Sequence, residues 1–132
     1  MKIISPIPVS IPLITEEGKI IRNEILTLDS HSVKTYAFCS DTAYNESIIP
    51  LIKCVDLLYH EATFLDSHEN LAKKTMHSTA KQAAKIAKLA QVKRLVLGHF
   101  SSRYKDKYQF IIEAKSVFDS VELASDGKVI QL

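Results

Sequence analysis

Three side chains capable of acid–base or metal-binding chemistry each follow an apolar stretch of the sequence. They are Asp41, Glu61 and His99. Apolar stretches of this length are typical of strands buried on both faces of a sheet. If these strands lie parallel, their carboxyl ends meet at one edge, where open α/β sheets place their functional sites. The spacing therefore predicts a site at that edge, with carboxylates and an imidazole that could bind a metal ion or transfer a proton.

Taken one at a time, these residues are weak signals. Asp41 alone is more often a turn or helix-cap residue, because Asp is common at strand ends. His99 needs a partner at the end of a buried strand, and a metal ion is one such partner. His77 precedes Ser78-Thr79 at the start of a predicted helix, from where its ring could reach into a cleft. No H-x-x-x-H, C-x-x-C or glycine-rich phosphate loop strengthens the case.

The elements that must hold these residues alternate between strand and helix patterns. Strands are predicted at 34–40, 55–59 and 94–98, and helices at 78–89 and 106–118. Alanines recur at helical spacing in the first helix, which predicts close packing on a sheet, and its lysines are interpreted as a solvated face rather than an RNA site. Such alternation is typical of a layered α/β fold.

Two less regular segments carry predictions of their own. A short helix from Asn45 to Lys53 would contain Pro50, so its regular part should begin near that proline. Residues 121–124 and 128–132 are predicted to form two strands of a hairpin, because Ser125-Asp126-Gly127 between them is a turn signal.

Residues 1–33 differ in character from the rest of the chain. Their three prolines favour an extended path, and Glu17-Gly18 predicts a turn before a short strand at 19–21. We therefore divide the chain into an extended N-terminal segment, 1–33, and a domain, 34–132.

Composition narrows the class of protein without identifying it. The net charge is +2, from 17 basic and 15 acidic residues, which is too balanced to indicate nucleic-acid binding by itself. Cys39 and Cys54 lie in apolar surroundings and are interpreted as reduced core residues. No apolar run is long enough to cross a bilayer and no signal peptide is apparent, so we expect a cytoplasmic location.

Four motifs occur in a fixed order along the chain. They are Ser40-Asp41-Thr42, His60-Glu61-Ala62-Thr63-Phe64, His77-Ser78-Thr79 and Gly98-His99-Phe100-Ser101-Ser102-Arg103-Tyr104. Together they resemble the C-terminal half of ribonuclease Z, the tRNA 3′ endonuclease of the metallo-β-lactamase superfamily. The pairing of H-E-A-T-F with H-S-T is specific to this nuclease branch. The resemblance implies half of an αββα sandwich, an α/β fold with a mixed sheet and helices on one face, which would leave the other face exposed.

The resemblance also implies a role for each matched residue. Asp41 matches a carboxylate that bridges two zinc ions, and His99 matches a histidine that binds one of them. His77 matches the histidine that assists the leaving oxygen, and we expect Glu61 to orient it. Arg103 could bind a substrate phosphate, and a structural ion pair is an equal alternative. The implied reaction is zinc-dependent hydrolysis of pre-tRNA 3′ trailers.

The chain also departs from that family in its metal ligands. The leading motif H-x-H-x-D-H is absent, and the family's further histidine ligand has no counterpart. We therefore expect zinc to bind weakly or not at all to this chain alone, and whether it is an enzyme by itself stays open. The expected partners are pre-tRNA and either a missing N-terminal half or a second copy. The alternative is a non-catalytic scaffold that dimerises or binds RNA. A different metallo-hydrolase with a small substrate is argued against by H-E-A-T with H-S-T.

Overall fold

The computed structural model describes residues 12–22 and 33–132, and the chain divides into two compact units, Met1–Val33 and Lys34–Leu132. In the first unit, β1 (Leu13–Ile14) pairs antiparallel with β2 (Ile20–Ile21). The turn between them is closed by the Gly18 N–H, which donates to the Thr15 carbonyl at 2.8 Å. The predicted turn and short strand are therefore confirmed, whereas two of the three prolines, Pro6 and Pro8, lie outside the described residues.

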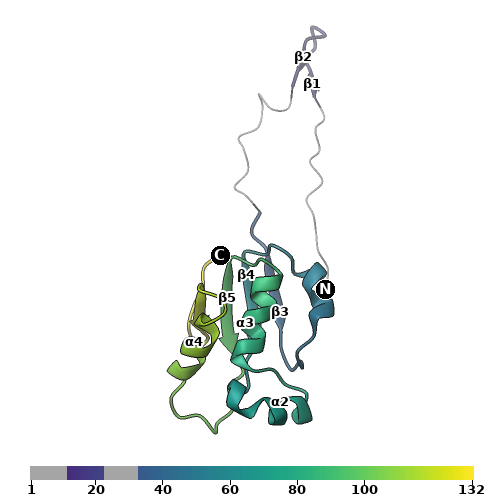
Figure 1. Cartoon of the computed structure of the whole chain (residues 1–132). Coiled ribbons are helices and arrows are strands. Elements are labelled where there is room, and N and C mark those ends of the chain that lie inside the picture. The colour runs from purple at the N-terminus through teal and green to yellow at the C-terminus, as the bar shows by residue number, and fades with distance from the viewer. Residues whose placement is uncertain (1–11, 23–32) are drawn as a thin grey trace. The chain divides into compact units, whose positions relative to one another are not determined.

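The second unit is built on a four-stranded parallel sheet (Figure 1). Its strands, in spatial and chain order, are β3 (Tyr36–Cys39), β4 (Leu57–Glu61), β5 (Arg94–Gly98) and β6 (Val121–Leu123). Each crossover between neighbouring strands carries helix, as parallel pairing requires. The predicted α/β alternation is confirmed, and strand directions are mixed across the chain because one sheet is antiparallel and the other parallel.

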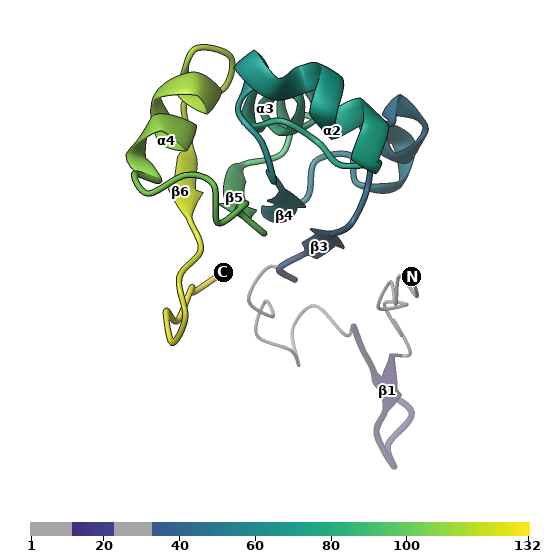
Figure 2. The same ribbon diagram turned by 90° about the horizontal axis from the view of Figure 1, so that it is seen from below.

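The helices of this unit lie over one face of the sheet (Figure 2). They are the 3-10 helices η1 (Glu46–Leu51) and η2 (Asp66–His68), and α2 (Glu69–Thr75), α3 (Ala80–Leu89) and α4 (Tyr108–Lys115). One helix layer on one sheet layer is the arrangement expected of half of an αββα sandwich. Among residues 12–22 and 33–132, no helix combines the length and apolar character needed to cross a membrane.

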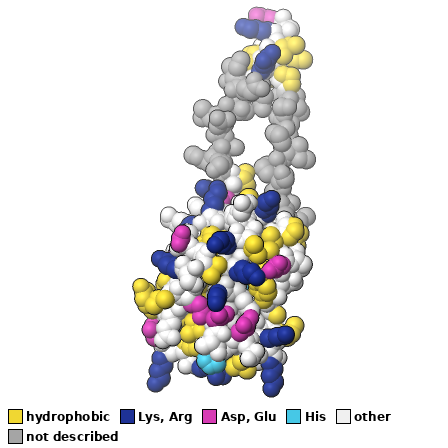
Figure 3. Space-filling model, in the orientation of Figure 1, with side chains coloured by type: hydrophobic (Ala, Val, Ile, Leu, Met, Phe, Trp, Pro, Cys, Tyr) yellow, Lys and Arg dark blue, Asp and Glu magenta, His cyan; other side chains and the backbone are white. Residues whose placement is uncertain are grey.

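The alanine-rich helix α3 forms as its sequence predicts. Thr79 caps it, since its side chain accepts from the Gln82 N–H while the Gln82 side chain accepts from the Thr79 N–H. Its inward residues Ala80, Ala83, Ala84, Ile86 and Ala87 are all fully buried. On the outer side, Lys81 pairs with Asp66 at 2.8 Å. Figure 3 shows basic and acidic side chains interspersed on this face, which fits a solvated surface rather than a single basic patch.

Two of the predicted elements are wrong in part. The segment after Asn45 is a 3-10 helix that begins at Glu46 and contains Pro50 near its end, so the prediction that it begins near Pro50 is wrong. The Asn45 side chain caps it by accepting from the Ser47 N–H at 2.9 Å. The predicted C-terminal hairpin is absent from the described residues, because β6 pairs in parallel with β5 and residues 128–132 form no strand. Lys128 instead donates its side-chain N–H groups to the Glu122 carboxylate and the Leu123 carbonyl.

The two cysteines also differ from their prediction. Both are free thiols, as expected of reduced residues, but Cys54 is exposed and Cys39 only partly buried. Cys54 has a φ of 59° and lies in the turn between η1 and β4, where the left-handed backbone turns the chain rather than placing a side chain in the core.

The sheet face opposite the helices keeps an apolar surface. Tyr36 and Phe38 of β3 are 51% and 60% exposed, and the Phe38 ring stacks on Tyr59 at 4.6 Å between centroids. A groove of about 270 Å³ runs between the strands and the C-terminal residues, and Leu57 and Val96 contribute to its lining. The expectation that one face of the sheet is left partly uncovered is met in this unit.

Gly98 is required where β5 passes the ring of Tyr59. A Cβ at this position would lie 2.6 Å from both Cε2 and Cζ of Tyr59. We expect Gly98→Ala to lower the free energy of unfolding by about 1–3 kcal/mol, because the ring must leave its stack on Phe38. Urea unfolding measures this. In a Tyr59→Ala background the same substitution should cost much less, and equal costs in both backgrounds would contradict the contact.

Candidate active site

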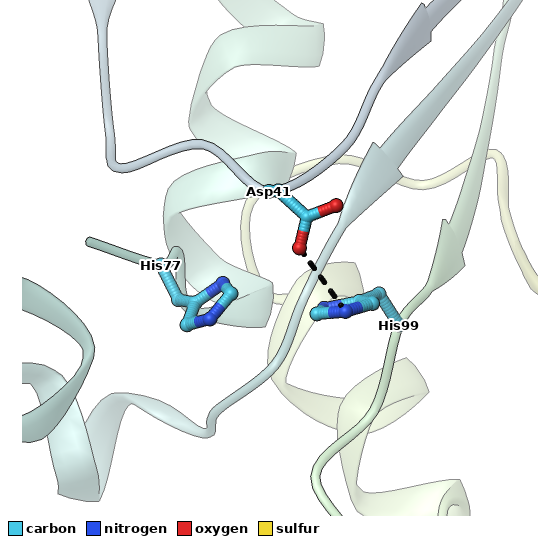
Figure 4. A group of neighbouring side chains, drawn as sticks. All are labelled: Asp41, His77 and His99. Carbon is cyan, nitrogen blue, oxygen red and sulfur yellow. Dashed lines mark ion pairs between the residues drawn. The ribbon is translucent and has the colours of Figure 1, made fainter. Parts of the chain in front are cut away.

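Asp41, His77 and His99 converge at the carboxyl edge of the parallel sheet (Figure 4). Asp41 follows β3, His99 follows β5, and His77 lies between α2 and α3. One potential ligand atom from each residue lies within 4.8 Å of the other two. His99 Nε2 is 3.2 Å from Asp41 Oδ1, and the two imidazole centroids are 5.2 Å apart. The expected meeting of these three side chains at one edge is confirmed.

The backbone at this edge is held in an uncommon conformation. Asp41 and His99 have φ values of 49° and 59°, in the left-handed region that residues with a Cβ rarely adopt. Met76, directly before His77, has a φ of 61° and ends α2. Residues held in this region store roughly 1–3 kcal/mol of strain each, and such strain clusters at functional sites. Here it turns the chain sharply as it leaves each element, so that the side chains point toward a common centre.

Glu61 is the buried carboxylate behind the site. It is fully buried, and both of its oxygens are occupied by donors. Oε1 accepts from the Thr42 N–H at 3.0 Å and lies 2.7 Å from His77 Nδ1. Oε2 accepts from the Thr63 N–H at 3.0 Å and from the Thr63 hydroxyl at 2.7 Å. A carboxylate accepts only, so His77 donates from Nδ1 and its Nε2 is left for the site. The predicted hydrogen bond between Glu61 and His77 is confirmed.

Thr63 is a site residue that the sequence analysis missed. Its hydroxyl oxygen lies 2.8 Å from His99 Nδ1 as well as 2.7 Å from Glu61 Oε2. Thr63 lies in the motif H-E-A-T-F, but the motif by itself assigns no chemical role to the hydroxyl. The available signal was spacing, because residues two apart along an extended segment point the same way, which places Thr63 beside Glu61.

Two other residues considered in the sequence lie outside this group. Arg103 is exposed in the loop after His99, and no ion pair of its guanidinium is found among the described residues. His60 lies beneath the helix layer, where its Nδ1 is 2.7 Å from the Glu61 carbonyl. Burial lowers the pKa of His60, so a neutral ring is favoured there.

The donor set fits a metal ion of the zinc type. Zinc accepts histidine nitrogen and carboxylate oxygen, at bond lengths of about 2.0–2.2 Å. Two ligands of a tetrahedral ion at that distance are roughly 3.4 Å apart, close to the 3.2 Å between His99 Nε2 and Asp41 Oδ1. In both histidines Nδ1 lies within hydrogen-bond distance of a buried side-chain oxygen, 2.8 Å for His99 and 2.7 Å for His77, and metal-binding imidazoles usually have such a partner at their other ring nitrogen.

Comparison with known proteins adds a family and several relatives. Residues 25–100 match the model of the "Beta-lactamase superfamily domain" family. The chain is 53% identical over 114 residues to ribonuclease Z of Parabacteroides distasonis, covering 86% of this chain and 38% of that protein. It is 49% identical over 118 residues to ribonuclease Z of Porphyromonas gingivalis, covering 89% and 39%. The chain thus spans about two fifths of the length of these curated relatives.

Two solved structures share this architecture. The metallo-β-lactamase fold protein YhfI from Bacillus subtilis superposes with a TM-score of 0.70 at 28% identity, covering 77% of this chain and 42% of that one. Human tRNase Z, short form, superposes with a TM-score of 0.52 at 40% identity, covering 70% and 30%. The similarity therefore extends over the unit that carries Asp41, His77 and His99, and each match covers less than half of the compared chain.

Proposed function

Because the chain belongs to the beta-lactamase superfamily, we propose that it forms the C-terminal half of a zinc-dependent endoribonuclease that removes 3′ trailers from pre-tRNA in the cytoplasm. One observation carries the proposal: a carboxylate and two imidazoles converge, and buried Glu61 hydrogen-bonds His77 directly. Relatives that bear the name ribonuclease Z at 49–53% identity support the same activity.

Each residue of the group has a distinct part in this proposal. Asp41 Oδ1 and His99 Nε2 hold the metal side of the site, where zinc, when bound, would activate a water and offset the charge of the phosphate. His77 donates a proton from Nε2 to the departing 3′ oxygen. Glu61 accepts from His77 Nδ1, so the ring is held in one orientation and its protonated form has a nearby negative charge.

Substrate contacts are proposed on the loop that follows His99. Arg103 is exposed there and is free of ion pairs within the described residues, so its guanidinium is available to bind a phosphate through paired hydrogen bonds. Lys107 lies further along the same loop, with Nζ 5.5 Å from the centroid of the Phe100 ring. These two cations lie in the segment that leaves the site, which suits the polyanionic backbone of RNA.

A second candidate function has one observation in its favour. The exposed aromatic surface of β3, with Tyr36 and Phe38, is the kind of apolar patch that binds another protein. A non-catalytic scaffold could dimerise or bind RNA through this face. In the first proposal the same face instead packs against the N-terminal half of a sandwich.

Reassembly tests the proposed function. We expect the chain, mixed with the N-terminal part of the Parabacteroides distasonis relative, to cut a pre-tRNA after the discriminator base and leave a 3′ hydroxyl. Gel analysis of end-labelled RNA locates the cut, and ligation to an adaptor that requires a 3′ hydroxyl identifies the end. A stable complex of the two parts that leaves the trailer intact would favour the scaffold.

A further inference from the structure

The hydroxyl group of Thr63 lies between a buried carboxylate and a ring nitrogen of His99. Its oxygen is 2.7 Å from Glu61 Oε2 and 2.8 Å from His99 Nδ1. Thr63 is 7% exposed and Glu61 is fully buried, so bulk water has little access to the bond between them, whereas the His99 side chain is 41% exposed. A hydroxyl has one proton to donate and lone pairs that accept, and it can therefore donate to only one of these two neighbours.

The Thr63 hydroxyl donates preferentially to the Glu61 carboxylate. Glu61 accepts only, and a hydrogen bond to a charged acceptor is about twice as strong as one between neutral groups. When the Thr63 hydroxyl donates its hydrogen bond to Glu61 Oε2, the Thr63 oxygen can only accept from His99. The donor in that second bond must then be an N–H at His99 Nδ1. In a neutral His99 ring, Nε2 is then without a proton and presents its lone pair to the site.

Asp41 favours the other tautomer of the His99 ring. Its Oδ1 is 3.2 Å from His99 Nε2, and in a neutral ring this contact favours a proton on Nε2. Asp41, however, is 70% exposed, so solvent weakens its attraction, whereas the Thr63–His99 contact is partly buried and the Thr63–Glu61 contact is buried. The competition is therefore between an exposed carboxylate on one side of the ring and a buried hydroxyl–carboxylate pair on the other.

We propose that Thr63 is a positioning residue that relays the buried carboxylate of Glu61 to His99, so that the neutral ring carries its proton on Nδ1. Each oxygen of Glu61 acts on a different histidine. Oε1 accepts directly from Nδ1 of His77, and Oε2 accepts from the Thr63 hydroxyl, which in turn accepts from Nδ1 of His99. One buried side chain thereby turns Nε2 of both imidazoles toward the same centre. The value of this arrangement for a metal ligand rests on the proposed function, but the proton position does not.

Nitrogen-15 NMR of the chain with labelled histidines tests the proposal without an activity assay. In the metal-free chain, we expect the neutral His99 ring to show a protonated Nδ1 and an unprotonated Nε2. Loss of the signals in His99→Gln assigns them. A wild-type His99 with its proton on Nε2 would overturn the proposal, whether or not any variant folds.

Substitutions at Thr63 separate the hydroxyl from the shape of the side chain. Thr63→Val should move the His99 proton to Nε2, facing Asp41, and Thr63→Ser should keep it on Nδ1. Thr42→Val is the matched control, because the Thr42 hydroxyl bonds the Ala43 carbonyl and no ring, so His99 should be unchanged. An unaltered proton position in folded Thr63→Val would contradict the relay. A correct proton position in a reassembled protein that does not cleave RNA would leave the relay intact and count against the proposed function.

Discussion

His77→Ala should lower the turnover of the reassembled nuclease by about 10²–10⁴-fold, the usual contribution of a positioned acid, while its zinc content stays nearly unchanged. The reason is that the leaving 3′ oxygen would depart without a proton, whereas Asp41 and His99 would still hold the metal. Asp41→Ala should behave differently and lose zinc together with activity. Single-turnover cleavage and atomic spectrometry on the same preparations measure the two quantities.

A histidine outside the site controls for the substitution itself. His68 pairs with the Tyr104 hydroxyl at 2.8 Å and does not belong to the group formed by Asp41, His77 and His99. His68→Ala should therefore keep both turnover and zinc. If His77→Ala loses as much zinc as Asp41→Ala, then His77 is a metal ligand and its proposed role as an acid is wrong.

A second large effect is expected on zinc binding and RNA cleavage when the 132-residue chain is tested alone. It should bind zinc weakly and leave the trailer of a pre-tRNA uncut. A catalytic zinc site usually needs three protein ligands and an open position, and a two-metal site needs more. In the proposed roles, Asp41 and His99 supply the ligands from this chain. A single weakly held ion cannot stabilise both the attacking and the leaving oxygen.

Metal analysis and cleavage must be measured together in this case. Purified chain is assayed for bound zinc and for trailer removal, before and after the N-terminal part of a relative is added. About two zinc ions per chain, as a two-metal site requires, together with 3′ cleavage by the chain alone, would contradict the prediction. Cleavage that begins only on mixing would support it.

The sequence predicted the parts of the structure that depend on local patterns. The helix after Thr79 was predictable because its cap and its alanines are neighbours in the chain. The predicted C-terminal hairpin was wrong, because residues 121–123 pair in parallel with β5, more than 20 positions earlier in the chain. A turn signal such as Ser125-Asp126-Gly127 describes a local bend and carries no information about which strand pairs with which.

For the candidate site as well, some features could be predicted from the sequence and others could not. The meeting of Asp41 with His99 follows from parallel strands that end at one edge, which the sequence pattern already implied. The roles of His77 and Glu61 came from the resemblance to ribonuclease Z, since no spacing rule places a loop histidine against a strand carboxylate. Spacing alone could place Thr63 beside Glu61 but not beside His99, because 36 positions separate Thr63 from His99 in the chain.

The left-handed backbone at Asp41 and His99 has a consequence for protein engineering. Glycine adopts such angles without penalty, so replacing either residue by glycine removes backbone strain at the same time as it removes the side chain proposed to hold the metal. Laboratory selection for heat resistance alone would therefore favour changes at the two positions proposed to hold the metal. Improved variants of this domain should be selected for activity and thermostability together, since under the proposed function both properties depend on the same two residues.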